Sequence, residues 1–340
     1  MTSFVRAAVV AAAPAPDSPR EAAPDLVLPP VAGDWMARAE AVARAVGDAL
    51  KARAGLDERE WPAMPCLVGS SSHFIGAREA QPEAELGPPV EFAARLARCF
   101  GASGPVMMVN TACTSGLTAL ALARDMIDAG RCRHALVLGV ELANRLSGIG
   151  FGALGLLSAS TAKPCDRDRD GLVLGEAFGA LLVSDSGAWR IAAAATEIDP
   201  SGFAAPAPNE DIFARAMRAA LSAAAWKAAD VDLLKLQAGG SPTGDLAEGR
   251  AIRGTFASLP HLVSFKGAIG HTLGASGPAE LALLLAALSR GRVPPTAGFR
   301  HADAEVGLEP RAADGGTVRR VLFNLAGFGG HVASLALARE

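Results

Sequence analysis

Apolar strands that alternate with long helical segments constrain this chain more than any other feature of its sequence. The segments "PCLVGSSS" (65–72), "PVMMVN" (105–110) and "HALVLGVEL" (134–142) are mostly apolar, and helical stretches separate them. Strands without a polar face are typical of a parallel or mixed sheet that helices cover on both sides. The sequence therefore predicts an α/β fold with a sheet between helical layers.

The first half also contains predicted helices with recognisable ends. One runs from a candidate Asp34 N-cap to Gly55, another lies near 88–100, and a third follows Cys113. The proline-rich residues 14–34 predict a surface excursion before the first of these helices. The short, alanine-rich start "MTSFVRAAVVAAAPAPDS" has some features of a signal peptide, and a buried first strand explains it as well.

The second half repeats this order of elements. We expect a strand at 231–240, a helix at 245–256, a strand and turn at 262–271, a helix at 276–292 and two strands joined by a glycine-rich turn within 319–338. Each half places a long Ala/Leu helix directly after a polar turn, "TACTSG" in one and "GHTLGASG" in the other. This repetition indicates an internal duplication, with one half at 1–188 and the other at 189–340.

Composition excludes several classes of protein. Half of the 340 residues are apolar and 20% are charged, which argues against disorder or a fibrous repeat. The net charge of −3 and the lack of a Lys/Arg-rich run argue against nucleic-acid binding, and the apolar stretches are too short to span a bilayer. Five scattered cysteines without CxxC spacing fit neither a disulfide framework nor a zinc site. We expect a cytoplasmic protein without a metal or other cofactor.

Cys113 is the first candidate for chemistry. It lies between an apolar strand and a predicted helix, where unpaired N–H groups and the helix dipole favour a thiolate. A free cysteine is also among the residues most often buried without any function. This stretch alone leaves both readings open.

Three further stretches change the balance. The motifs "TACTSG", "PCDRDRDGLVLGEA", "SFKGAIGHTLGASGPAE" and "AGFGG" occur in this order. Together they resemble the β-ketoacyl synthases, condensing enzymes that work on acyl carrier proteins. The resemblance implies a thiolase-like fold of two similar αβ halves with α-β-α-β-α layers and a site at their junction.

The resemblance also assigns roles to individual residues. It implies that Cys113 is the acylated nucleophile, that His271 is the second catalytic histidine, and that Lys266 accompanies it. The N–H groups of Cys113 and Phe328 would form an oxyanion hole, with Phe328 and Gly329 in a gating hairpin. Supporting positions around the pocket would be Asp245, Glu280 and Glu176, the last within a scaffold element that also contains Arg169 and Asp170.

Two positions depart from the family pattern. Alignment on Pro242, Asp245 and Glu248 puts Gln237 where the family has its first catalytic histidine, so the triad reads Cys-Gln-His. A glutamine amide can donate a hydrogen bond to an oxyanion but cannot take up a proton near neutral pH. His331 stands where the family usually has threonine, and it could either point into the pocket or be structural.

The function implied by the resemblance is acyl transfer from an acyl carrier protein to Cys113. Decarboxylative condensation with malonyl carrier protein would follow, in fatty acid or polyketide biosynthesis. One alternative is a transacylase or thioester-gating enzyme that stops after acylation. Another is a partner subunit similar to chain-length factors, although such partners usually lack the cysteine. A homodimer or heterodimer through the strand "PVMMVN" is expected, and the acyl chain preference is left open.

Overall fold

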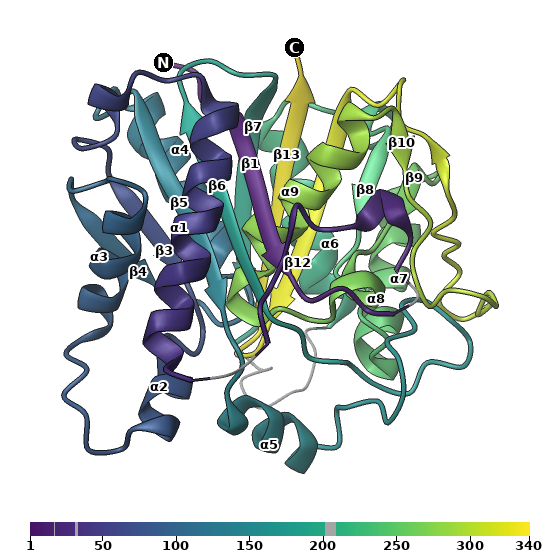
Figure 1. Cartoon of the computed structure of the whole chain (residues 1–340). Helices are drawn as coiled ribbons and strands as arrows, with labels where there is room; N and C mark the ends of the chain where they lie inside the picture. Colours follow the sequence, from purple (N-terminus) through teal and green to yellow (C-terminus); the bar gives the residue numbers. More distant parts are fainter. Residues whose placement is uncertain (17, 31–32, 201–208) are drawn as a thin grey trace.

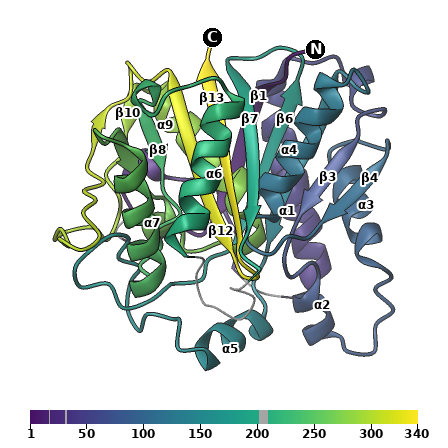
Figure 2. The same cartoon turned by 180° about the vertical axis from the view of Figure 1, so that it is seen from behind.

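The chain folds into five layers, in which helices alternate with sheet. The computed structural model describes residues 1–16, 18–30, 33–200 and 209–340. One outer layer holds α1 (Trp35–Ala54) and α3 (Pro89–Cys99), and the other holds α6 (Glu210–Ala223) and α7 (Pro242–Thr255) (Figures 1 and 2). Helices α4 (Ser115–Asp128) and α9 (Ser276–Ser289) lie in the central layer. The expected α-β-α-β-α architecture is confirmed.

The strands follow the same order in both halves. Those of the first half are β1 (Phe4–Ala12), β2 (Leu26–Val27), β3 (Cys66–Gly69), β4 (Val106–Val109), β5 (His134–Glu141) and β6 (Ala177–Ser184). Those of the second half are β7 (Trp189–Ile198), β8 (Leu233–Lys235), β9 (His261–Val263), β12 (Arg320–Gly327) and β13 (His331–Arg339). Their order across the sheet is β4-β3-β5-β6-β1-β7-β13-β12-β8-β9, with β2 paired to β1.

The two halves of the sheet show the same succession of strand directions when each is followed from its outer edge to the middle. In each half three strands are parallel, namely β4, β3 and β5 in one and β9, β8 and β12 in the other. Two antiparallel strands then follow towards the middle. The halves join where β1 pairs with β7 over two residue pairs, Phe4–Arg190 and Val5–Trp189. The two similar αβ halves are thus confirmed, while the division at 188/189 stays a prediction.

Strand residues alternate between the layers. In β1, Val9 packs in an outer core beside α1, and its neighbour Val10 packs in the central core beside α4 and α9. In β13, Val332 packs in the other outer core beside α6, whereas Leu335 faces the central one. Because both faces of these strands are buried, the sequence shows continuous apolar runs rather than alternation.

The ends of α1 follow the predicted capping signals. The Asp34 carboxylate accepts a hydrogen bond from the Ala37 N–H at 2.6 Å, and Gly55 takes a left-handed conformation with φ 59°. An aspartate N-cap and a left-handed glycine satisfy backbone groups that a helix end otherwise leaves unpaired. The helix predicted from Asp34 to Gly55 is confirmed.

Three other predictions are corrected. The region 14–34, expected as a surface excursion, contributes the parallel strand β2 and the buried residues Ala22 and Leu28, although 17 and 31–32 lie outside the described residues. Helix α7 begins at Pro242 rather than 245, because the Ser241 hydroxyl caps it through the Gly244 N–H. The turn predicted before His271 contains a short helix, α8 (Lys266–Ile269).

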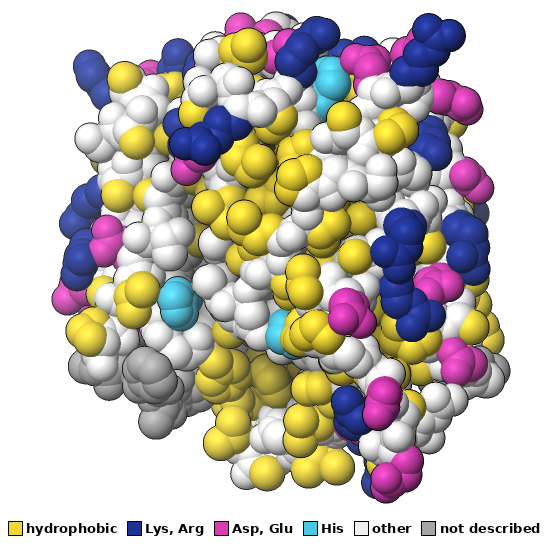
Figure 3. Space-filling model, turned by 90° about the vertical axis from the view of Figure 1, so that its left-hand side faces the viewer, with side chains coloured by type: hydrophobic (Ala, Val, Ile, Leu, Met, Phe, Trp, Pro, Cys, Tyr) yellow, Lys and Arg dark blue, Asp and Glu magenta, His cyan; other side chains and the backbone are white. Residues whose placement is uncertain are grey.

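Strand β4 differs from the prediction that helices cover both faces of every strand. It forms the edge of the sheet, and the Met107 side chain is 46% exposed. Figure 3 shows hydrophobic side chains gathered on the side of the molecule where β4 and α3 lie. The short helices α2 (Ile75–Ala80) and α5 (Arg145–Ala153) and the hairpin β10 (Arg292–Val293) and β11 (Ala313–Asp314) complete the fold. Within the described part of the chain, no helix is both long and apolar enough to cross a membrane.

Glycines allow the central helices to touch, and this contact can be tested. A Cβ added at Gly277 of α9 would lie 2.6 Å from the backbone nitrogen of Leu117 in α4. We therefore expect Gly277→Ala to lower the free energy of unfolding by about 1–3 kcal/mol, because the two backbones must separate. Gly254→Ala in α7 is the matched control, since a Cβ at this position meets open space. This change should raise the free energy of unfolding by up to about 1 kcal/mol. Urea denaturation measures both, and equal stability of the two variants would contradict the contact.

Candidate active site

Cys113 follows β4 through a tight backbone turn. Ala112 has φ 53°, a left-handed conformation that an alanine rarely adopts. The Ser115 hydroxyl holds the turn by donating to the Ala112 carbonyl at 2.5 Å and accepting from the Thr111 N–H at 3.0 Å. The turn places the Cys113 thiol at the N-terminal end of α4, and its side chain is buried.

The glycine-rich hairpin between β12 and β13 lies directly against Cys113. A Cβ on Gly327 would come within 2.9 Å of the Cys113 backbone nitrogen, so this close approach requires glycine. The N–H groups of Phe328 and of Cys113 itself lie close enough to the Cys113 sulfur to lower the pKa of the thiol. Two donors from separate elements thus converge at the sulfur, as the resemblance implies for an oxyanion hole.

The resting form of Cys113 is the thiol. Burial and the nearby Glu141 carboxylate raise its pKa to about 12, against the opposing effect of the two N–H groups and Lys266. The predicted position at a helix start holds, but desolvation outweighs the groups that would favour a thiolate. Activation of this nucleophile therefore requires a change in its surroundings when substrate enters.

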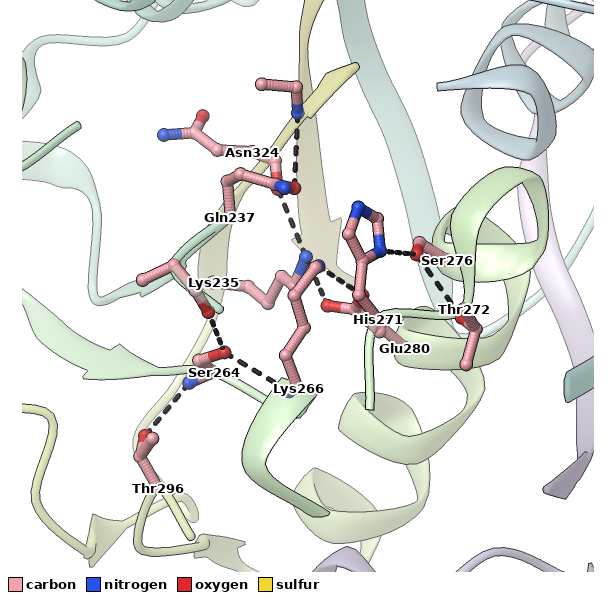
Figure 4. Close-up of polar contacts among 12 residues, drawn as sticks. Lys235, Gln237, Ser264, Lys266, His271, Thr272, Ser276, Glu280, Thr296 and Asn324 are labelled. Atoms are coloured by element: carbon pink, nitrogen blue, oxygen red, sulfur yellow. Dashed lines mark hydrogen bonds and ion pairs between the residues drawn. The ribbon is translucent and has the colours of Figure 1, made fainter. Parts of the chain in front are cut away.

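His271 is a buried, neutral hydrogen-bond donor. Its Nδ1 accepts from the Leu273 N–H at 3.2 Å, and the Ser276 hydroxyl lies 3.4 Å from the same atom (Figure 4). A ring nitrogen that accepts a backbone N–H carries no proton, so Nε2 carries it. Burial, followed by the charges of Lys266 and Lys235, holds the pKa of His271 well below its ordinary value.

Gln237 is oriented by its own hydrogen bonds. The Gln237 side chain is drawn in Figure 4, and its Oε1 accepts from the Ala326 N–H at 3.2 Å. Its backbone N–H donates to Glu248 at 2.8 Å. Because only the amide oxygen can accept from an N–H group, the Nε2 end is left as a donor. The structure therefore gives Gln237 the same chemical role that His271 has, an uncharged donor.

These side chains surround one small cavity. Its volume is about 50 Å³, room for a few water molecules, and Cys113, Gln237 and His271 line it together with Asp245 and Phe328. The Phe328 ring packs edge-on against Phe151 of α5, with ring centroids 5.1 Å apart. The cavity is too small to hold an acyl chain, and the Phe151–Phe328 contact forms part of its wall.

Fully buried charges lie behind the donors. Lys266 contacts one oxygen of Glu280 at 2.5 Å, and Lys235 contacts the other at 2.5 Å (Figure 4). The Lys235 ammonium also donates to the Asn324 carbonyl at 3.1 Å. Lys266 and Glu280, two predicted site residues, are thus ion-paired, together with a second lysine that the sequence analysis did not single out.

Asp245 and Glu248 hold the loop that carries Gln237. Asp245 accepts hydrogen bonds from the N–H groups of Cys165, Gly239 and Gly240. Glu248 accepts from the N–H groups of Gln237 and Ala238, both at 2.8 Å. Backbone donors of a tight loop are satisfied in this way without water. The structure places Asp245 as a support of the loop as well as in the cavity wall.

Three predicted positions lie away from the small cavity. Glu176 pairs with Arg38 at 2.7 Å and lines a separate, larger cavity of about 730 Å³. Gly329 and His331 do not line the small cavity either. The Nδ1 atom of His331 is buried, and no hydrogen-bond partner lies among the described residues. Their roles in chemistry stay predictions.

Glu141 is a functional-site neighbour that sequence analysis missed. It accepts hydrogen bonds from the backbone N–H groups of Ser71, Ser72 and Gly274 at 2.9–3.0 Å, and from both serine hydroxyls. It therefore ties the loop after β3 to the segment that follows His271. The sequence feature that could have identified Glu141 is a single charged residue in an otherwise apolar strand. Lys235 shows the same feature in "DLLKLQ".

A possible cation site lies apart from the cysteine. Ligand atoms of Asp166, Asp168 and His301 lie within 4.8 Å of one another at the rim of the larger cavity. The Asp166 carboxylate already accepts the N–H groups of Asp168, Arg300 and His301. This group of residues is explained by loop structure and adds nothing to the chemistry at Cys113.

Comparison with known proteins agrees with this geometry. Residues 39–187 match the family described as "Beta-ketoacyl synthase, N-terminal domain", and residues 189–300 match its C-terminal domain. The chain belongs to the β-ketoacyl synthase family. The 3-oxoacyl-[acyl-carrier-protein] synthase 2 of Mycobacterium tuberculosis is 34% identical over 70% of this chain, which spans 62% of that relative's length.

Other relatives of this β-ketoacyl synthase family member come from polyketide pathways. The ketoacyl synthase alpha subunit of the tetracenomycin polyketide synthase of Streptomyces glaucescens is 31% identical over 94% of this chain and 79% of its own length. A solved structure of a ketosynthase in complex with its chain length factor, from Xenorhabdus doucetiae, has a TM-score of 0.78 and 22% identity. The match covers all of this chain and 98% of that one. This likeness establishes the thiolase-like fold.

The charge of Glu141 can be tested on the thiol. Replacing Glu141 with Gln removes the negative charge that raises the Cys113 pKa, so the pH profile of alkylation by iodoacetamide should move to lower pH. At pH 8 we expect the alkylation rate to rise about two- to tenfold, while unpaired N–H donors lower the unfolding free energy by about 1–3 kcal/mol.

The matched control for this experiment is Glu79→Gln. Glu79 also accepts two backbone N–H groups, those of Arg145 and Leu146, but it does not contribute to the pKa of Cys113. An unchanged alkylation profile in Glu141→Gln, or an equal change in the control, would remove Glu141 from the account of the thiol.

Proposed function

We propose that this chain is an acyltransferase of the condensing type. It would take an acyl group from an acyl carrier protein onto Cys113 and then join it to a two-carbon unit from malonyl carrier protein. One observation carries the proposal: two separate pairs of donors face the same small cavity. The Cys113 and Phe328 N–H groups lie at the sulfur, and Gln237 and His271 line the cavity with uncharged N–H donors.

The first pair of donors fits the acylation step. The Cys113 sulfur attacks the thioester carbonyl carbon, the oxygen becomes an oxyanion, and the bond to the carrier thiol then breaks. The proton of Cys113 leaves with that thiol. Backbone N–H groups that are in place before the charge develops stabilise such an oxyanion without reorganisation.

The second pair fits condensation. The bond between the malonyl carboxylate and its α-carbon breaks, carbon dioxide leaves, and the electron pair forms an enolate. Its oxygen would accept hydrogen bonds from Gln237 and His271, and its carbon would attack the Cys113 thioester and release the sulfur. No step in this sequence requires Gln237 to take up a proton, so the substitution is compatible with the reaction.

A transacylase that stops after acylation is the second candidate, and Gln237 itself favours it. A ring at this position can exchange a proton and carry a positive charge, whereas an amide can do neither. If condensation depends on either property, the chain would load acyl groups without extending them. This candidate shares the acylation step with the first and differs only at the enolate.

A second ketosynthase-like subunit would complete the assembly. Strand β4 presents an unpaired edge, and Met107 on it and Val90 at the start of α3 are exposed hydrophobic residues. Such an edge is usually covered by pairing with another chain. The Xenorhabdus structure pairs a ketosynthase with its chain length factor. For this chain, we propose that a homodimer or a heterodimer forms through the β4 edge. Five free cysteines fit a reducing cytoplasm.

Acylation should occur at Cys113 alone. Incubation with an acyl carrier protein loaded with a medium-chain acyl group should give one adduct by intact-mass analysis, and Cys113→Ala should abolish it because no other thiol lies under two N–H donors. Cys165→Ala is the matched control, a second fully buried cysteine that should leave the adduct unchanged. Adducts spread over Cys66, Cys99, Cys132 and Cys165 would refute the nucleophile.

Gln237 separates the synthase from the transacylase. If it acts only as a donor, the wild type should release carbon dioxide from malonyl carrier protein, and Gln237→His should change that rate by about tenfold or less. Gln237→Ala should lower it by about a hundred- to a thousandfold. An acylated wild type that releases no carbon dioxide, with or without a partner synthase, would instead identify a transacylase.

A further inference from the structure

Lys235 is a buried charge that the proposed mechanism has not used. Its ammonium group is fully buried, contacts Glu280 at 2.5 Å and Asn324 at 3.1 Å, and lies 4.1 Å from the centre of the Phe323 ring. Glu280 is already paired with Lys266 on its other oxygen. One carboxylate needs one cation, so the second lysine does not serve to neutralise Glu280.

The second lysine is balanced by a second carboxylate. Glu248 lies across Asn324, whose side-chain amide donates to it at 3.3 Å, and Glu248 also accepts two backbone N–H groups. Burial raises the pKa of Glu248 to about 7, against the backbone N–H groups of Gln237 and Ala238, which favour the carboxylate. The buried network therefore contains two lysines against two glutamates, joined through Asn324.

This network borders both enolate donors. Glu248 receives the backbone N–H of Gln237, and the charges of both lysines act on His271. Figure 4 shows the two lysine chains meeting at Glu280, with Gln237 and His271 on the segments around them. A change in the charge of Lys235 is therefore felt at the place where the enolate oxygen would lie, in surroundings of low dielectric constant.

We propose that Lys235 is a positioning residue for the condensation step. Its ammonium group, fixed by Glu280 and the Asn324 carbonyl, supplies the positive charge that Gln237 cannot carry and keeps His271 neutral, with its proton on Nε2. The proposal rests on the proposed function for its kinetic part alone. Without Lys235, two buried carboxylates would face Lys266 only, and the excess negative charge would oppose an enolate and favour a protonated His271.

Charged groups on the neighbouring helices act on Lys235 and His271. Burial lowers the pKa of Lys235 to about 7, Glu280 of α9 and Glu248 of α7 oppose this, and Lys266 of α8 adds to it. The Lys235 ammonium is therefore the predominant form below about pH 7, and the charge effect is to be measured there. Burial, Lys266 and Lys235 lower the pKa of His271. Because a positive neighbour disfavours the imidazolium, removing it should raise the pKa of His271 and not lower it.

Two variants of Lys235 separate charge from hydrogen bonding. Lys235→Met keeps the chain length and removes the charge, and Lys235→Gln also removes the charge but retains a donor for the Asn324 carbonyl. Lys227→Met is the matched control, because it removes the same charge from an exposed lysine. Histidine NMR of isotope-labelled protein then reports the tautomer and pKa of His271 without any substrate.

We expect wild-type His271 to stay neutral and Nε2-protonated well below the ordinary pKa of a histidine, and both Lys235 variants to raise its pKa measurably. Carbon dioxide release should fall about ten- to a hundredfold in both variants, with Cys113 acylation changed less than about threefold. The control should match the wild type in all three measurements.

Other results would overturn the proposal. An unchanged His271 pKa in both variants, or recovery by Lys235→Gln, would assign Lys235 to packing or hydrogen bonding instead. An ordinary titration of His271 near pH 6.5 in the wild type would contradict it even if neither variant folds. A wild type that never releases carbon dioxide would defeat the proposed function, while the NMR result would still decide the charge effect.

Discussion

The close contact between α4 and α9 in the central layer is the constraint on which the rest of this structure depends. Cys113 immediately precedes one of these helices, and His271 lies a few residues before the other. Gly116 and Gly277 let the two helices approach until their backbones touch. Each helix belongs to a different half of the duplicated fold, so the active site exists only because the halves pack without side chains at this point. A larger residue there would separate the nucleophile from its partner as well as loosen the core.

Much of this arrangement was predictable from sequence, for identifiable reasons. Helix α1 could be placed because Asp34 and Gly55 are local capping signals, and β3 and β5 because burial on both faces leaves apolar runs. Strand β4 was found by its apolar run although part of it is exposed. The strands β6 and β7 and the helix α6 were not predicted, although β6 is a continuous apolar run and Asn209 caps the start of α6. The exposed edge at β4 could not be predicted, since strand order is a property of the whole chain rather than of the segment.

The site was predictable to the extent that motifs carry it. Cys113, Gln237, His271 and Phe328 line one cavity, and Lys266 meets Glu280 behind it. Residues outside motifs were missed. Glu141 and Lys235 are single charges within apolar strands, and such residues reveal their partners only when strands from distant parts of the chain are brought together. The orientation of the Gln237 amide and the tautomer of His271 also follow from three-dimensional contacts that spacing cannot give.

The small cavity has a further consequence for the thiol. Burial and the Glu141 charge raise the Cys113 pKa to about 12, so the thiol form predominates at neutral pH. Oxidants and electrophiles attack thiolates, so a buried cysteine that keeps its proton reacts slowly with them. The surroundings that hold Cys113 protonated therefore also protect its sulfur from peroxide.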